Sequence, residues 1–307
     1  MNKHVMFKAS QAIALAVSLS FATLAALPAQ AAAPMAKTQA PGYYRMMLGG
    51  FEVTALNDGF FDLPVDKLLK QPADKTDAAL TKYFQKLPVE TSVNAFLINT
   101  GTKLVLVDTG TGGKSGATSG VLLANLAAAG YKPEQIDEIC ITHNHGDHIG
   151  GLTTADGKAV FPNATVHVGK ADGEADSAKA TFAPYMAAKK LSLIEGDGEI
   201  VPGVRAIATH GHTPGHTSYV VESQGQKMIV TGDLIHVAAV QLDDPSVTIN
   251  FDSDSTAAAA QRDKVFKAAA ADGSLIAATH LQFPGMGHLR ANGKSWVYVP
   301  VNYTRMR

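Results

Sequence analysis

The run THNHGDH at residues 142–148 restricts the possible folds of this chain more than any other stretch. Three imidazoles and one carboxylate lie within six residues, and a packed core gains nothing from polar groups that it would have to desolvate. Side chains two positions apart diverge on a helix, so His143 and His145 do not share a helical face. We therefore expect the run to follow a strand over 137–141, at a turn made by the glycines in and after it.

The side chains of this run are those of a metal site. Imidazole nitrogens and carboxylate oxygens suit zinc, and also manganese, cobalt and iron. Cys140, the only cysteine of the chain, lies in the apolar strand before the run, where we expect a buried and inert thiol. A single cysteine also excludes an internal disulfide.

The first 31 residues have the pattern of a secretory signal peptide. Lys3 and Lys8 give a positive start, residues 12–27 are apolar, and Ala29-Gln30-Ala31 resembles a cleavage site. The apolar stretch is short and rich in alanine and serine, which disfavours a membrane anchor. We expect export to a bacterial periplasm, or secretion, and a mature chain over 32–307 that folds as one domain.

The charge of the chain argues against a nucleic-acid partner. The formal net charge is −1, and loss of a leader with two lysines and no acidic residue makes it −3. No basic stripe accompanies this balance. We expect a small-molecule substrate, with neither nucleic acid nor membrane as a partner after cleavage of the leader.

Strands and helices alternate in two batches along the sequence. A hairpin is expected over 43–56, with further strands at 92–99, 103–107, 164–168, 204–208, 217–222, 227–230, 275–278 and 296–299. Helices are expected over 121–129, 182–190 and 257–271. This order predicts an α/β fold of two mixed sheets packed together with helices outside, in four layers.

Three later segments complete a set of ligands, each next to an expected strand. His216 ends the loop HGHTPGH at 210–216, Asp233 follows the strand at 227–230, and His280 follows the strand at 275–278. A carboxylate has two oxygens and can bridge two cations. The expected metal ligands are His143, His145, Asp147, His148, His216, Asp233 and His280. Seven ligands are too many for one tetrahedral ion and suit two divalent ions that share a carboxylate and a water.

The motif His-x-His-x-Asp-His, followed in order by a His, an Asp and a last His, resembles the metallo-β-lactamase superfamily. The resemblance implies the αβ/βα sandwich, with one metal on His143, His145 and His216. It implies a second metal on Asp147, His148 and His280, and Asp233 as the bridge. Asp108, in the segment VDTG, matches a position that orients a ligating histidine. His148 stands where the antibiotic-cleaving branch has cysteine, which disfavours a β-lactamase.

A closer resemblance covers nearly the whole mature chain. The segments APGYYRMMLGGFEVTALNDG, KLVLVDTG, HGHTPGHTSYVVESQGQK, DLIHVAAVQLDDPSV and PVNY are similar to those of the methyl parathion hydrolase group, exported di-metal hydrolases that include lactone and aryl-ester hydrolases. This resemblance also implies a homodimer. The chain departs from the organophosphate-cleaving pattern at four positions expected to line the substrate pocket, Leu68, His236, Ile249 and Phe251. We therefore favour lactones and aryl esters as substrates.

These features predict a di-metal hydrolase in which a metal-bridging hydroxide attacks the substrate, with zinc as the first choice of metal. The catalytic residues would be Asp233, as the bridge, and Asp147, which could take or relay a proton. His212 is expected to shape the surroundings of the ligands, and His236 to lie at the pocket rim without ligating. The alternatives are an organophosphate phosphotriesterase and, outside enzymes, a non-catalytic periplasmic metal-binding protein.

Overall fold

A computed structural model describes residues 33–306 of the chain. Residues 33–39 lie outside the compact unit that begins at Ala40 and contains every element named below. The expected signal peptide, residues 1–31, lies outside the described residues. Among the helices of residues 33–306, none combines the length and the apolar character that crossing a bilayer requires.

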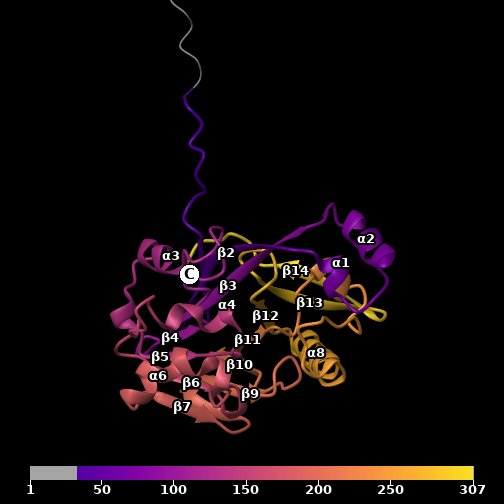
Figure 1. The fold of residues 1–307 in the computed structure, drawn as a ribbon. Helices are drawn as coiled ribbons and strands as arrows, with labels where there is room; N and C mark the ends of the chain where they lie inside the picture. Colours follow the sequence, from indigo (N-terminus) through magenta and orange to yellow (C-terminus); the bar gives the residue numbers. More distant parts are fainter. Residues whose placement is uncertain (1–32, 307) are drawn as a thin grey trace, which may run out of the picture. The chain divides into compact units, whose positions relative to one another are not determined.

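The compact unit contains two mixed sheets of seven strands each (Figure 1). In the first sheet the strands lie side by side in chain order: β1 (Tyr43–Leu48), β2 (Phe51–Leu63), β3 (Val89–Asn99), β4 (Leu104–Val107), β5 (Glu138–Cys140), β6 (Thr165–Gly169) and β7 (Leu191–Ile194). Neighbours are antiparallel from β1 to β4 and parallel from β4 to β7.

The second sheet also follows chain order. Its strands are β8 (Gly198–Val201), β9 (Val204–Ala208), β10 (Thr217–Ser223), β11 (Gln226–Gly232), β12 (Leu275–Ala278), β13 (Met286–Asn292) and β14 (Ser295–Pro300). Only β11 and β12 run parallel, and the other neighbours are antiparallel.

Helical elements connect the strands. They are α1 (Val65–Leu68), α2 (Ala73–Lys82), α3 (Leu122–Ala128), α4 (Gly146–Ile149), α5 (Lys170–Gly173), α6 (Lys179–Ala187), α7 (Ala238–Gln241) and α8 (Ser255–Asp272), with 3-10 turns at Pro133–Gln135, Gly150–Leu152 and Asp176–Ala178. The longest of them, α8, is capped at its N-terminus by Asp254, whose side chain accepts a hydrogen bond from the Ala257 amide. Its C-terminal cap is Gly273, in the left-handed conformation (φ 71°).

Three hydrophobic clusters hold the layers together. One lies between the sheets and joins side chains such as Val53 and Phe96 of the first sheet to Tyr219 and Val230 of the second. The other face of the first sheet packs against α3 and α6, and the other face of the second packs against α8 (Figure 1). The helices therefore lie outside two facing sheets, which confirms the predicted four-layer αβ/βα sandwich.

A fourth cluster, which we call the wall cluster, lies apart from these layers. It packs the short helices α1 and α2 against α7 and the segment after it, and none of these three helices is expected from the sequence. Its fully or nearly fully buried members are Val65, Leu69, Leu80, Val89, Val237, Ala239, Val240, Val247 and Ile249. Leu68 is half-buried against it.

The sandwich brings the predicted ligands together because they follow strands whose ends lie along one edge. Asp108 follows β4, the run 142–148 follows β5, Asp233 follows β11 and His280 lies two residues after β12. The pairs β4–β5 and β11–β12 are parallel, so their carboxyl ends meet at the same edge. The polar residues of the site are thus held by buried strands of both sheets.

Candidate metal centre

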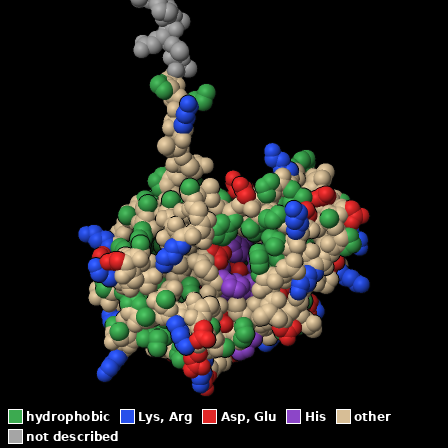
Figure 2. All heavy atoms as spheres, in the orientation of Figure 1, with side chains coloured by type: hydrophobic (Ala, Val, Ile, Leu, Met, Phe, Trp, Pro, Cys, Tyr) green, Lys and Arg blue, Asp and Glu red, His purple; other side chains and the backbone are tan. Residues whose placement is uncertain are grey.

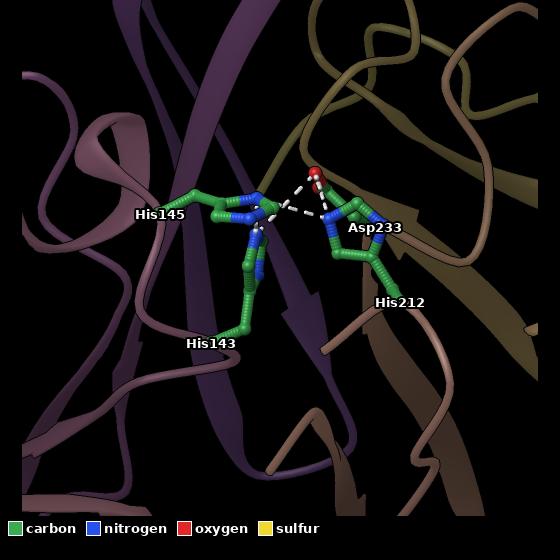
Figure 3. A group of neighbouring side chains, drawn as sticks. All are labelled: His143, His145, His212 and Asp233. Carbon is green, nitrogen blue, oxygen red and sulfur yellow. Dashed lines mark hydrogen bonds and ion pairs between the residues drawn. The ribbon is translucent and has the colours of Figure 1, made fainter. Parts of the chain in front are cut away.

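Four side chains converge into a first group of potential metal ligands: His143, His145, His212 and Asp233 (Figure 3). The Nδ1 atom of His145 lies 2.9 Å from His143 Nε2 and 3.1 Å from His212 Nε2. The Oδ2 atom of Asp233 lies 3.6 Å from His143 Nε2 and 3.3 Å from His212 Nε2. All four donor atoms therefore face one point between the two sheets.

A second group lies beside the first and consists of Asp147, His148 and His280. Asp147 Oδ2 is 3.6 Å from His148 Nε2 and 3.4 Å from His280 Nε2. Asp147 and His148 belong to the single turn α4, which begins directly after His145. This turn rotates the second half of the motif away from the first, so one run of sequence supplies two groups.

Asp233 joins the two groups through its separate oxygens. Whereas Oδ2 faces the first group, Oδ1 lies 3.3 Å from both His148 Nε2 and His280 Nε2. Asp233 Oδ1 and His148 Nε2 are buried atoms that have no hydrogen-bond partner. Buried polar atoms without partners are costly, and two of them aimed at a common point indicate a site for an ion.

The donor set fits two divalent cations. Two ligand atoms of a tetrahedral zinc ion lie ~3.3 Å apart when each bond is ~2.05 Å long. The distances above, from 2.9 to 3.6 Å, scatter around this value. His143, His145 and His212 would hold one ion, Asp147, His148 and His280 the other, and Asp233 both.

Buried acceptors hold three of the histidines in orientation. His148 Nδ1 donates to Asp108 Oδ2 over 2.8 Å, as the sequence predicts for Asp108. His280 Nδ1 donates to the carbonyl oxygen of Ser92 over 2.9 Å. His212 Nδ1 donates to Asp252 Oδ1 over 2.9 Å, a partner that the sequence does not predict. In each case the acceptor fixes a proton on Nδ1, so Nε2 is the nitrogen that can bind a metal.

The prediction that His216 is a ligand and His212 belongs to the surroundings is corrected by this geometry. His216 Nε2 accepts a hydrogen bond from the Asp233 backbone amide over 3.1 Å, and its Nδ1 lies 3.1 Å from the Thr209 carbonyl oxygen. Both nitrogens are therefore in use, and His216 supports the backbone of Asp233. The two histidines share one loop, so strand-end position alone does not separate them.

Charge in the two groups is distributed unequally. Burial lowers the pKa of His145 to about 4, with His212 acting in the same direction, and burial also lowers the pKa of His143. Burial would lower the pKa of His280 too, but Asp233 and Asp147 raise it to about 10. Although burial acts to raise the pKa of Asp233, the surrounding histidines lower it well below its usual value. An ionised carboxylate beside the neutral imidazoles of His143 and His145 favours a cation in the first group. His212 differs from them, because burial would lower its pKa but its contacts with Asp233 and Asp252 outweigh that effect and raise the pKa.

The four predicted pocket residues lie in different environments. Figure 2 shows a hollow on one face of the molecule, with histidine and acidic side chains inside it and hydrophobic side chains beside it. Phe251 is 41% exposed, and its ring centroid lies 6.1 Å from that of His236. His236 is buried, stacks on His280 and places Nε2 3.1 Å from Asp233 Oδ2. It therefore lies deeper than the predicted rim position. With Asp233 and His280 it forms a third group of side chains that could hold an ion, which the prediction of a non-ligating residue does not include.

The remaining two predicted pocket residues, Leu68 and Ile249, differ in their burial. Leu68 is half-buried at the end of α1 and packs against the wall cluster. Ile249 is fully buried within the wall cluster, so it supports the wall and does not contact a ligand in the hollow. The prediction that Ile249 lines the pocket is corrected accordingly.

Asp172 is a further polar residue of the site that the sequence does not single out. It follows β6, is 1% exposed and accepts hydrogen bonds from the Asn144 amide (3.2 Å), the Thr213 hydroxyl (2.6 Å) and the Gly215 amide (2.8 Å). It thereby ties the loop of His143 to the loop of His212. No local pattern marks it, because its partners lie about 30 and 40 positions away in the sequence.

Comparison with known proteins agrees with this fold and site. The family model described as the metallo-beta-lactamase superfamily matches residues 88–280, more than half of the chain. Each of the seven side chains that form the two groups falls within that range. The chain belongs to the metallo-β-lactamase superfamily, as the sequence resemblance predicts.

Individual relatives are hydrolases. The chain is similar to an N-acyl homoserine lactonase of Bacillus cereus, with 34% identity over 34% of this chain and 40% of the relative. The match to a Bacillus sp. lactonase has 37% identity over 32% and 38% of the two chains. The chain therefore spans about two fifths of the length of the curated relatives that it matches.

Solved structures match over more of the chain. A hydrolase of the beta-lactamase superfamily, AbOPH, has 36% identity and a TM-score of 0.83 over 87% of this chain and all of its own. AidC, a dizinc quorum-quenching lactonase, has 25% identity and a TM-score of 0.79 over 86% of this chain and 99% of its own. These matches support a metal-dependent hydrolase with lactonase relatives.

Proposed function

We propose that this protein is a di-metal hydrolase that cleaves lactones and aryl esters. One observation carries the proposal: the two oxygens of Asp233 face two separate groups of nitrogen donors at 3.3–3.6 Å. A lone structural ion needs no such bridge. Two cations held here would supply an activated water and polarise the carbonyl oxygen of the substrate.

Asp147 is the residue best placed to handle the proton released during hydrolysis. Its side chain is 19% exposed, whereas those of Asp233 and the histidines of the second group are exposed by no more than 4%. Asp147 therefore connects the buried centre to solvent. His280, 3.4 Å from Asp147 Oδ2, lies within reach of the same proton path.

The wall of the hollow supports an aromatic or alkyl substrate. Leu68 and the exposed ring of Phe251 offer apolar surface, and the imidazole of His236 adds one polar group between that surface and the centre. Pockets of this composition bind small organic molecules. The relatives named as lactonases support the lactone part of the proposal.

The chemistry of the leaving group supports aryl esters as substrates. A phenolate with a pKa of roughly 10 leaves with little need for protonation, whereas an alkoxide requires a general acid. None of the four predicted pocket residues carries an acidic side chain. The signal-peptide pattern supports a location of this activity in the periplasm or outside the cell.

A substrate panel on metal-assayed protein tests the proposal. The panel compares kcat/KM for an aryl lactone, a phenyl ester, an acyl homoserine lactone and methyl parathion. We expect two metal ions per chain and at least tenfold higher kcat/KM for the lactones and the phenyl ester than for methyl parathion.

Three outcomes would contradict this expectation. A tenfold preference for methyl parathion would identify a phosphotriesterase. Two bound ions without turnover of any activated ester would identify a non-catalytic metal-binding protein. One ion per chain would remove the bridge. Asp233→Asn is the matched variant that tests the bridge, because it keeps the shape of the side chain and removes one of the two anionic oxygens.

A further inference from the structure

The segment 248–254 connects the wall cluster to a metal ligand. Asp252 Oδ1 accepts a hydrogen bond from His212 Nδ1 over 2.9 Å, and both side chains are fully buried. The other carboxylate oxygen, Oδ2, accepts from the Ile249 amide over 3.1 Å. Both oxygens are therefore engaged, one by the ligand and one by the backbone of the wall.

The same segment is fixed to the end of α1. The Asn250 amide donates to the Leu68 carbonyl over 2.9 Å, and the Lys70 amide donates to the Thr248 carbonyl over 2.8 Å. Leu69 and Ile249 form an isolated antiparallel bridge between these hydrogen bonds. The half-buried Leu68 and the buried Ile249 thus belong to one paired unit.

On its other side the segment is fixed to the loop of His212. The Ser253 amide donates to the His212 carbonyl over 3.0 Å, and the Asp254 amide donates to the Gly211 carbonyl over 2.8 Å. His212 is therefore held by Asp252 at its ring and by Ser253 at its backbone. Asp252 cannot rotate away from His212 without also giving up the Ile249 amide.

We propose that Asp252 is a positioning residue that couples the pocket wall to the first metal ion. Its carboxylate fixes the proton on His212 Nδ1, so that Nε2 faces the ion, and its position depends on the packing of Ile249. A change in the packing of Ile249 therefore changes affinity for the first ion, and binding of that ion orders the segment 248–254. The inference rests on the proposed di-metal centre.

Asp252→Asn tests the ring contact with little change in shape. In one orientation of the asparagine, the amide oxygen accepts from His212 and the amide NH₂ faces the Ile249 N–H, so two donors meet. In the other orientation, the NH₂ faces the Nδ1–H of His212, and again two donors meet. We expect about 10–100-fold weaker binding of one of the two ions, with the other unchanged. Competition with a chromophoric zinc chelator gives both affinities, and the absorption spectrum of the cobalt-substituted protein reports the geometry of the weakened site.

Asp254→Asn is the matched control for that experiment. It makes the same chemical change two residues away, at the exposed cap of α8, where asparagine caps as well as aspartate. We expect wild-type affinities for both ions in this variant. Equal affinities in Asp252→Asn and the wild type would overturn the inference, and so would equal weakening in Asp254→Asn.

A second pair of variants tests the coupling from the side of the wall. Ile249→Ala and Leu80→Ala each remove a nearly fully buried aliphatic side chain from the wall cluster, but only Ile249 belongs to the segment that holds Asp252. We expect weaker binding of the first ion in Ile249→Ala and unchanged metal affinity in Leu80→Ala. Equal affinities in the two variants would contradict the coupling, even if Asp252→Asn does not fold.

The wild-type titration separates this inference from the proposed function. Wild-type protein that binds fewer than two ions contradicts the di-metal centre itself. Two ions in the wild type, together with unchanged affinities in Asp252→Asn and Ile249→Ala, contradict only the role of Asp252.

Discussion

The metal centre and the wall cluster lie next to each other and are built on different principles. In the centre, polar side chains from distant strands meet, and three of the histidines are held by a further polar partner, Asp108, Ser92 or Asp252. The wall cluster joins short helices by packing aliphatic side chains, supported by backbone hydrogen bonds. The centre holds individual donor atoms in the positions that metal binding requires, whereas the wall only holds an apolar surface in place.

This difference predicts different responses to substitution. Loss of one partner in the centre leaves another buried charge or polar atom unpaired, which lowers the stability of the fold by the full desolvation penalty of that group. Loss of methyl groups in the wall leaves a cavity whose cost grows with its volume. The four predictions below, ordered from the largest expected effect to the smallest, test whether the two regions separate in this way.

Asp233→Ala should lower kcat/KM by about 10³-fold or more, since the bridge contributes to holding both ions and ion-assisted catalysis supplies several kcal/mol. Secondary structure measured by circular dichroism should be retained, because the sheets do not depend on this side chain. Kinetics and metal content of the variant check the prediction. Full activity would exclude the bridging role.

Leu80→Ala should destabilise the protein by ~2–5 kcal/mol, because Leu80 is 1% exposed within the wall cluster. The bound metal should remain at two ions per chain, while KM rises as the wall loosens. Urea unfolding of the metal-loaded protein, together with metal analysis, measures both quantities. Loss of metal in this variant would mean that the two regions are not separable.

Metal affinity should increase with pH between about 6 and 9. The carboxylates of Asp233 and Asp147 overcome the effect of burial and raise the pKa of His280 to about 10, so below that pH a cation must displace a proton from the ring. Each displaced proton lowers the apparent affinity by about tenfold per pH unit below the pKa. Chelator competition across this range is the measurement, and a flat profile would be inconsistent with a proton on the second group.

Phe251→Ala should have the smallest effect, which we expect only in substrate binding. A substrate that covers roughly 60 Å² of this exposed ring gains ~1.5 kcal/mol at about 25 cal/mol per Å², or about tenfold in KM for aryl substrates. Metal content and stability should match the wild type. A large fall in kcat with unchanged KM would place Phe251 in the chemistry and not in the wall.

Local patterns in the sequence predicted the architecture and the type of site. The expected strand at 275–278 coincides with β12, and the expected helix at 257–271 lies within α8. The run 142–148 identified the site because its residue types have no other use in a buried strand end. The same patterns missed α1, which has only four residues, α2, which buries only Thr76 and Leu80, and β13, whose last three residues are all exposed.

The errors within the site have a common physical origin. The choice between His212 and His216 is made by Asp252 and by the Asp233 amide, which lie 40 and 17 positions away in the sequence. The burial of Ile249 likewise depends on α1 and α2, which contact it only in the folded chain. Residue type and spacing identify candidate ligands, but tertiary contacts decide which of them points at the ion.

Each group of ligands draws on both halves of the sandwich. His143, His145, Asp147 and His148 come from the half that contains the first sheet, and His212, Asp233 and His280 from the half that contains the second. A chain with a single cysteine has no disulfide to link its halves, and the cations would act as its cross-links. Two fragments divided between β7 and β8 would each lack part of both groups, and only Asp233, His236 and His280 would stay together in one fragment. Binding of two ions by their mixture would therefore report that the fragments had reassociated.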